Sequence, residues 1–165
     1  MTRIKRTKQI KRVFGLCLLL ALAASAGAAQ AKVRPEIMGV ALGMSREAAQ
    51  ARLKAIGQLE KEDRRRQEVW AINDPRISHL LVGYDADYRV RYVTAIARTD
   101  GPRMRYQEVA DLKSAQRLNS QGNYRFTWEI PERRGQVAFV VIALGRDPNF
   151  LDSYSIKKVG EKEVD

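Results

Sequence analysis

The sequence has little of several residue types on which many active sites depend. It contains one cysteine, Cys17, and one histidine, His79, and no acidic residue precedes Glu36. Cys17 lies in the N-terminal segment, and without it the rest of the chain has no disulfide, no thiolate metal ligand and no cysteine nucleophile. One histidine without cysteine also argues against a transition-metal site. We therefore expect no cofactor and no bound metal.

Residues 1–31 have the three parts of a secretory signal peptide. Six basic residues form the head, an apolar run over 13–22 follows, and the motif A-Q-A at 29–31 places small residues where signal peptidase reads them. A membrane-spanning helix needs roughly 20 apolar residues, and the strongly apolar part here is shorter and runs into alanine. We predict cleavage after Ala31, a periplasmic or secreted protein, and no stable membrane anchor.

The net charge of the whole chain, +11, suggests nucleic-acid binding, but much of it comes from the N-terminal segment. Six of the 30 Lys and Arg, and none of the 19 Asp and Glu, lie in residues 1–31, which leaves 24 basic and 19 acidic residues and a net charge of +5. This balance favours solubility and mild attraction to anionic surfaces. We expect no nucleic-acid partner and keep an anionic envelope surface as an alternative. The charged tail, 160–165, is expected to be flexible.

Residues 32–159 are long enough for one domain with its own core. A helix over 45–57 is predicted by apolar residues at helical spacing, with the Ser45 hydroxyl as its N-cap. A second helix is predicted over 106–114, and an extension to Leu118 stays open. Apolar alternation and apolar runs predict six strands, over 68–72, 77–84, 89–98, 124–130, 137–144 and 151–157.

The order of elements is helix, three strands, helix, three strands, and the highly charged residues 58–66 are interpreted as an exposed connection. Trp70 and Trp128 fall in the first strand of each half, which raises a duplication of half-units 37–100 and 103–158 as one interpretation. We predict an α+β fold, in which an antiparallel sheet of helix–three-strand meander units has its helices packed on one face.

Residues 39–47, G-V-A-L-G-M-S-R-E, resemble the opening of the small BamE/SmpA envelope lipoproteins and of domains with the β-lactamase-inhibitor-protein fold (BLIP-like). The resemblance covers about residues 37–98 and includes Trp70 and the turn at 84–87. It implies a helix followed by a three-stranded meander, used to bind proteins in the envelope and not for catalysis. The lipid-bearing cysteine of the first family and the disulfides of the second are missing, so no particular partner is implied.

The candidate catalytic residues have simpler explanations. His79 is interpreted as a strand residue near a sheet edge with a backbone partner. Asp85 and Asp87 suit a turn better than a calcium loop, which needs more ligands, and Asp100 follows a strand. No Gly-x-Ser-x-Gly elbow and no phosphate-binding glycine loop occurs. We expect that the protein is not an enzyme, and a carboxylate-based hydrolase stays open as an alternative.

Two basic clusters, Arg64-Arg65-Arg66 and Arg133-Arg134, have aromatic residues nearby, as in proteins that bind anionic polymers. Acidic residues interrupt both clusters, so we interpret them as solvated loops; those near the first are Glu60, Glu62, Asp63 and Glu68. Binding of anionic envelope polymers through these clusters remains an alternative function.

The candidate partner-binding residues are Tyr84, Arg89, Arg91 and Tyr92. Tyrosine and arginine are enriched where proteins bind proteins, and a sheet face free of helices would be a natural binding surface. The function predicted from the sequence is a non-enzymatic, protein-binding or inhibitor-like module whose partner is another envelope or secreted protein.

Overall fold

The computed structural model describes residues 33–63, 66–132 and 137–160. The chain divides into two units, Met1–Gln30 and Ala31–Asp165, and every described residue belongs to the second. The architecture below is therefore that of the second unit alone.

Two predictions from the sequence fall outside the described residues. These are the signal peptide with its cleavage after Ala31, and residues 161–165 of the expected flexible tail. In the part of the chain that the structure describes, no helix is long and apolar enough to cross a membrane.

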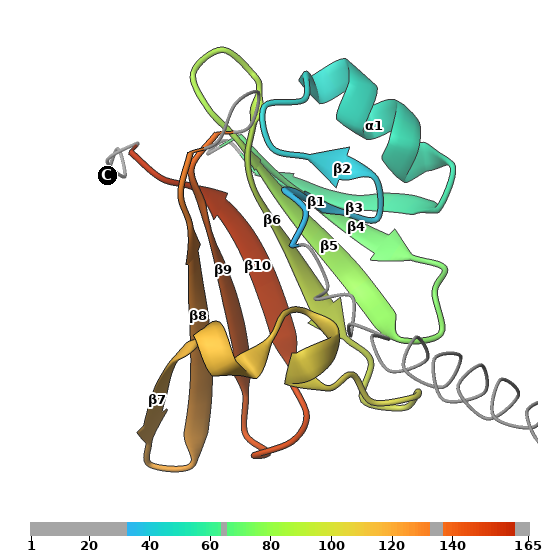
Figure 1. The fold of residues 1–165 in the computed structure, drawn as a ribbon. Helices are drawn as coiled ribbons and strands as arrows, with labels where there is room; N and C mark the ends of the chain where they lie inside the picture. Colours follow the sequence, from blue (N-terminus) through green and yellow to red (C-terminus); the bar gives the residue numbers. More distant parts are fainter. Residues whose placement is uncertain (1–32, 64–65, 133–136, 161–165) are drawn as a thin grey trace, which may run out of the picture. The chain divides into compact units, whose positions relative to one another are not determined.

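The described part consists mostly of strands (Figure 1). In chain order the elements are β1 (Glu36–Ile37), β2 (Val40–Ala41), α1 (Arg46–Lys54), β3 (Gly57–Asp63), β4 (Gln67–Ile72), β5 (Ile77–Tyr84), β6 (Val90–Ala97), the 3-10 helices η1 (Tyr106–Glu108) and η2 (Leu112–Ser114), β7 (Gln116–Ser120), β8 (Asn123–Ile130), β9 (Phe139–Gly145) and β10 (Ser153–Lys158). Eight strands form one antiparallel sheet in the order β3-β4-β5-β6-β10-β9-β8-β7, and β1 pairs with β2 in a separate hairpin.

The predicted α+β fold, with two helices packed on one face, is wrong, because the structure is mostly β and has a single α-helix in its described part. Residues 57–63 and 116–120 are strands and not a connection or a helix, so each meander has four strands instead of three. The predicted helix over 106–114 is replaced by η1 and η2. Asp111 between them has extended backbone and caps the second turn by accepting from the N–H of Lys113, which prevents one continuous helix.

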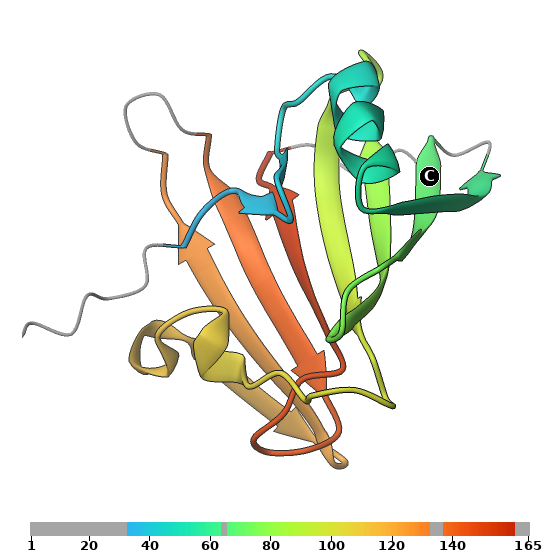
Figure 2. The same ribbon diagram turned by 90° about the vertical axis from the view of Figure 1, so that its right-hand side faces the viewer.

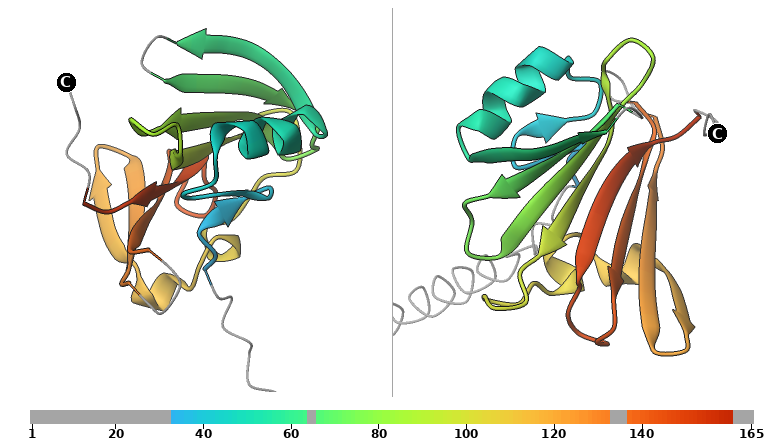
Figure 3. Two further views of the ribbon diagram at one scale, coloured as in Figure 1. Left: turned by 90° about the horizontal axis from the view of Figure 1, so that it is seen from above. Right: turned by 180° about the vertical axis from the view of Figure 1, so that it is seen from behind.

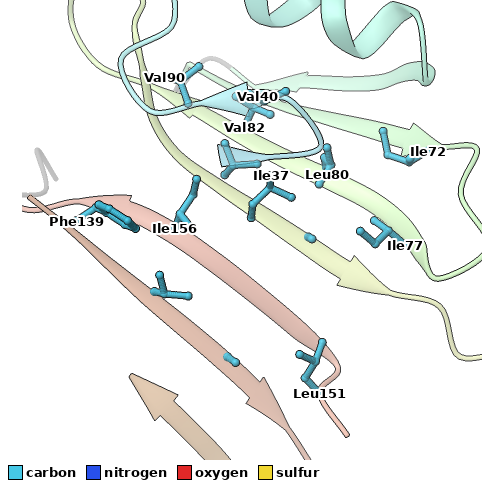
Figure 4. Packing of buried hydrophobic residues seen from close by; sticks show 14 of the residues in the cluster. Ile37, Val40, Ile72, Ile77, Leu80, Val82, Val90, Phe139, Leu151 and Ile156 are labelled. Atoms are coloured by element: carbon cyan, nitrogen blue, oxygen red, sulfur yellow. The ribbon is translucent and has the colours of Figure 1, made fainter. Parts of the chain in front are cut away.

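The strand register divides the side chains of the large sheet into two faces. The inner face carries the buried core, including Leu80, Phe139 and Ile156 (Figure 4). The register places Trp70 and Val141 on the same face. The hairpin β1–β2 adds Ile37 and Val40 to this core. The sheet bends around these residues, and α1, the β1–β2 hairpin and the two 3-10 helices all lie on the inner face (Figures 2 and 3). The second face is called the open face below.

Helix α1 begins as the sequence predicts but ends for a different reason. The Ser45 hydroxyl accepts a hydrogen bond from the N–H of Ala48 at 3.3 Å, and Ala49 and Leu53 face the core. Gly57 is not a left-handed helix stop: it opens β3, where a Cβ would lie 2.1 Å from the carbonyl oxygen of Ala71. This glycine is required by the close approach of β4, and not by backbone conformation.

Candidate functional site

The open face is the side of the sheet that no helix and no hairpin covers in the described part of the chain (Figure 3). Three rows of side chains cross it, as the register shows. The first row contains Gln58, Ala71, His79, Ile96, Ser153, Leu144, Arg125 and Leu118. The second contains Lys61, Val69, Leu81, Thr94, Ser155, Ile142, Thr127 and Gln116. The third contains Gln67, Gly83, Tyr92, Lys157, Val140 and Glu129.

Apolar side chains form two patches on this face, one in each meander. The first patch consists of Val69, Ala71, Leu81 and Ile96, and the second of Val140, Ile142 and Leu144. The seam between them is polar, with Thr94 and Ser155 hydroxyls 2.8 Å apart. Most of these residues are half-buried, and Leu144 is 43% exposed. Contiguous apolar surface on an open sheet, rimmed by charge, is typical of a surface that contacts another molecule.

A groove deepens the open face over β7–β10. Its volume is about 1070 Å³, and its lining includes Leu118, Arg125, Thr127, Val140, Ile142 and Lys157. The register places all six on the open face. Four of the lining residues are basic and one, Glu129, is acidic, so the groove combines an apolar floor with a positive rim.

The four predicted partner-binding residues do not form one surface. Tyr84 is 4% exposed and lies on the inner face, where it cannot contact a partner directly. Tyr92 lies on the open face, but its ring covers Gly83 and its hydroxyl donates to Gln67 Oε1. Arg91 lies beside it, with its guanidinium 5.5 Å from the Tyr92 ring centroid. Arg89 is exposed in the β5–β6 turn and donates to the carbonyl oxygen of Gly43.

Among the described residues, Glu68 is the one charged residue that is buried, at 1% exposure, and it lies in the strand predicted over 68–72. Its two carboxylate oxygens accept four hydrogen bonds, of 2.7–3.0 Å, from Arg46, Gln50, Trp70 and Tyr84. Burial alone would raise the pKa of Glu68, but these hydrogen bonds outweigh it and hold the pKa below its ordinary value. Burial and the carboxylate beside it raise the pKa of Tyr84.

Glu68 is a structural group and not a catalytic one. General acids, general bases and metal ligands need an oxygen that a substrate or ion can reach, whereas both oxygens here are engaged and covered. Arg46 and Gln50 come from successive turns of α1, so the carboxylate fixes the helix on the sheet. The sequence signal for this role was the position of Glu68 in alternation with Trp70 and Ile72, which places it on a buried strand face.

His79 lies in an interior strand and not near a sheet edge, because β3 and β4 lie outside β5. Its partners are side chains and not backbone: Nδ1 is 3.0 Å from Ser78 Oγ and Nε2 is 3.2 Å from Glu60 Oε2. The Ser78 hydroxyl donates to the carbonyl oxygen of Ile96. The histidine therefore joins β3 to β5 across the open face.

The aspartates considered as catalytic or metal-binding residues lie in turns. Asp85 Oδ1 accepts from the N–H groups of Asp87 and Arg89, both at 2.9 Å, which is the turn role that the sequence predicts. Asp100 is exposed after β6. Among the described residues, no three His, Cys, Asp or Glu side chains gather in a way that could hold a metal ion.

Four of the five arginines in the two basic clusters lie outside the described residues: Arg64, Arg65, Arg133 and Arg134. Arg66 is described: it is exposed, and its guanidinium lies 5.5 Å from the Tyr88 ring centroid.

Comparisons of the chain with protein-family models, with curated proteins and with solved structures find no match. The open face is therefore interpreted from its own geometry.

Proposed function

We propose that the protein is an exported, non-enzymatic binding module whose open sheet face contacts another envelope or secreted protein. The observation that carries this proposal is the arrangement of cover: α1, the β1–β2 hairpin and the 3-10 helices all lie on the inner face, while two apolar patches lie on the other. Burying these patches against a partner would remove apolar area from water.

The composition of the open face fits a protein partner. Its centre is apolar or uncharged, and its charged residues, such as Lys61, Arg125 and Glu129, lie toward the margins of the sheet. Depletion of charge at the centre with a polar rim is the usual composition of protein–protein interfaces. The resemblance of residues 37–98 to BamE-like and inhibitor-fold domains implies the same class of activity.

Export is the second part of the proposal, and it rests on the signal-like sequence of residues 1–31. Expression of the full chain in its own cells, followed by intact-mass measurement of the envelope fraction, tests it. A mass that corresponds to cleavage after Ala31 supports export. Recovery of the uncleaved chain from the cell interior would contradict it.

Capture of the partner from an envelope extract tests the role of the open face. Leu144→Asp places a carboxylate in the second apolar patch, and we expect it to reduce recovery of the partner about tenfold or more, because an unpaired charge would be buried in the contact. Leu112→Asp is the matched control, since this leucine is similarly exposed, at 37% against 43%, but belongs to η2 on the inner side.

The capture is made at low and at moderate salt. A protein recovered at both, lost with Leu144→Asp and kept with Leu112→Asp, supports the proposal. Material that washes away with salt and is equally recovered with both variants would contradict it and indicate an anionic polymer bound through basic residues.

A further inference from the structure

Strand β7 is one of the two outer strands of the sheet, and its free edge is open in the described part of the chain. It pairs with β8 alone, and all five of its residues are exposed. The turn between β7 and β8 has two residues, Gln121 and Gly122, both with positive φ. In such a hairpin the flanking residues form a hydrogen-bonded pair, and bonded pairs alternate along the ladder. The N–H and C=O groups of Arg117 and Asn119 are thereby directed to the free edge.

The two outer strands differ in how well they are protected against pairing with another chain. In β3, the register shifts between Leu59 and Lys61, and three charged residues follow one another at 60–62. Bulges and charges are devices that prevent edge-to-edge association. In β7 the register is regular, and Arg117 is its one charged residue. The β7 edge therefore lacks the protection that β3 has.

Charge around β7 selects the kind of strand that could pair with it. Four basic residues line the groove beside it, and the register places Arg125 and Lys157 on the open face and Arg117 and Lys158 on the inner face. The Arg117 guanidinium is placed over the rings of Tyr124 and Phe126, at 5.6 and 5.5 Å from their centroids. These contacts hold a positive charge at the edge before any partner arrives, and preorganisation of this kind favours binding.

We propose that β7 binds an extended, acidic segment of the partner protein by strand addition. The segment would pair with the outward backbone N–H and C=O groups of Arg117 and Asn119. It would place an acidic side chain opposite Arg117 and an apolar side chain opposite Leu118, which is 61% exposed. This inference rests on the proposed protein-binding function and names the chemistry of the partner.

A second copy of the chain fits this edge less well. Antiparallel pairing of two β7 strands about Leu118 would make the Arg117 side chains of the two copies diagonal neighbours on one face of the joined sheet. Like charges at such distances are destabilising, whereas an acidic segment would neutralise them.

The probe is a fluorescent, end-blocked heptapeptide that alternates glutamate and valine, with its binding to the full chain measured by anisotropy. A heptapeptide with lysine in place of glutamate is the control. We expect the acidic peptide to bind at least tenfold more tightly, and we expect Asn119→Pro, which removes an outward N–H, to abolish binding. Asn119→Ala keeps that N–H and should bind as the unaltered chain does.

Circular dichroism confirms that each variant is folded, and Arg117→Glu provides a second test if the proline variant does not fold. This charge reversal should weaken binding of the acidic peptide and strengthen binding of the lysine peptide. Equal binding of both peptides, or equal binding by Asn119→Pro and Asn119→Ala, would overturn the inference. So would a dimer of the unaltered chain that Asn119→Pro dissociates, because the edge would then bind a second copy.

The same variants separate this inference from the proposed function. If the captured partner is lost with Leu144→Asp but kept with Asn119→Pro, the open face binds the partner and strand addition is wrong. If Leu144→Asp has no effect on capture, the proposed function fails, whatever the peptides do.

Discussion

The two meanders have the same topology but hold their covering segments by different chemistry. The strand order is symmetric about the β6–β10 pair, and a twofold axis through Thr94 and Ser155 relates Trp70 to Trp128 by register. Both indoles lie on the inner face, and both donate from Nε1. The acceptor for Trp70 is the Glu68 carboxylate at 3.0 Å, and that for Trp128 is the carbonyl oxygen of Asp111 at 2.8 Å.

The difference extends to the position two residues before each tryptophan. The same axis places buried Glu68 of the first meander where the second has Phe126. Glu68 binds α1 through Arg46 and Gln50, whereas the Phe126 ring packs against Tyr106 of η1 with centroids 4.4 Å apart. One helical segment is attached by a buried charge and the other by aromatic packing.

This comparison shows that one sheet topology tolerates opposite solutions at equivalent positions. A buried carboxylate is stable only if every donor around it is present, while a buried ring depends on the volume that it fills. The first meander should therefore be sensitive to the loss of single polar groups, and the second should not.

The largest expected effect is that of Glu68→Leu. The substitution leaves the buried donors of Trp70 and Tyr84 without an acceptor and removes the carboxylate that half-buried Arg46 and Gln50 bind, so we expect the free energy of unfolding to fall by about 3–5 kcal/mol. Phe126→Leu at the equivalent position should cost about 1 kcal/mol. Urea unfolding followed by circular dichroism measures both.

Glu62→Gln is the control for charge alone, because exposed Glu62 also pairs with Arg46, at 2.6 Å. It should change the free energy of unfolding by less than about 1 kcal/mol. Equal losses for Glu68→Leu and Phe126→Leu would remove the distinction between the two meanders.

A smaller effect is expected when each of the two related tryptophans is replaced by phenylalanine. Trp70→Phe removes a hydrogen bond to a charged acceptor and Trp128→Phe one to a neutral acceptor, so the losses should be about 2 and about 1 kcal/mol. Each variant keeps the tryptophan of the other meander, whose fluorescence reports unfolding. A greater loss for Trp128→Phe would reverse the comparison.

The smallest effect is expected from acid, because protonation removes the charge of Glu68 and leaves its side chain in place. The pKa of Glu68 is lowered in the folded chain, so its contribution to stability is complete above the ordinary carboxyl pKa of about 4.3 and is lost as pH falls from there through the lowered value. Between pH 7 and pH 3, the free energy of unfolding should fall more steeply with acid in the unaltered chain than in Glu68→Gln. Parallel curves would contradict this.

The sequence predicts the interior strands of the sheet and misses its two outer ones. The six predicted strands are confirmed with shifts of one to two residues at most ends, because their apolar residues are buried on the inner face. Strands β3 and β7 are polar and largely exposed, so no burial pattern marks them, and each is held by pairing with one neighbour. This omission also explains why Trp70 and Trp128 lie in the second strand of each meander and not in the first.

The open face was only partly predictable. A free sheet face follows from helices on one side, and Tyr92 does lie on it, but Tyr84 was expected there and is buried. Alternation along β5 places Tyr84 on the inner face with Leu80 and Val82, beside Glu68, and the register shift in β6 brings Val90 and not Arg91 opposite it. A local change of register cannot be derived from alternation, which assumes a regular strand.

Radical footprinting of the full chain, in buffer and in an envelope extract, tests the proposed binding surface most directly. We predict that the extract protects open-face side chains such as Leu81, Ile142 and Leu144 and leaves the exposed side of α1 unchanged. Protection confined to α1, or to the turn at 85–89, would contradict a partner on the open face.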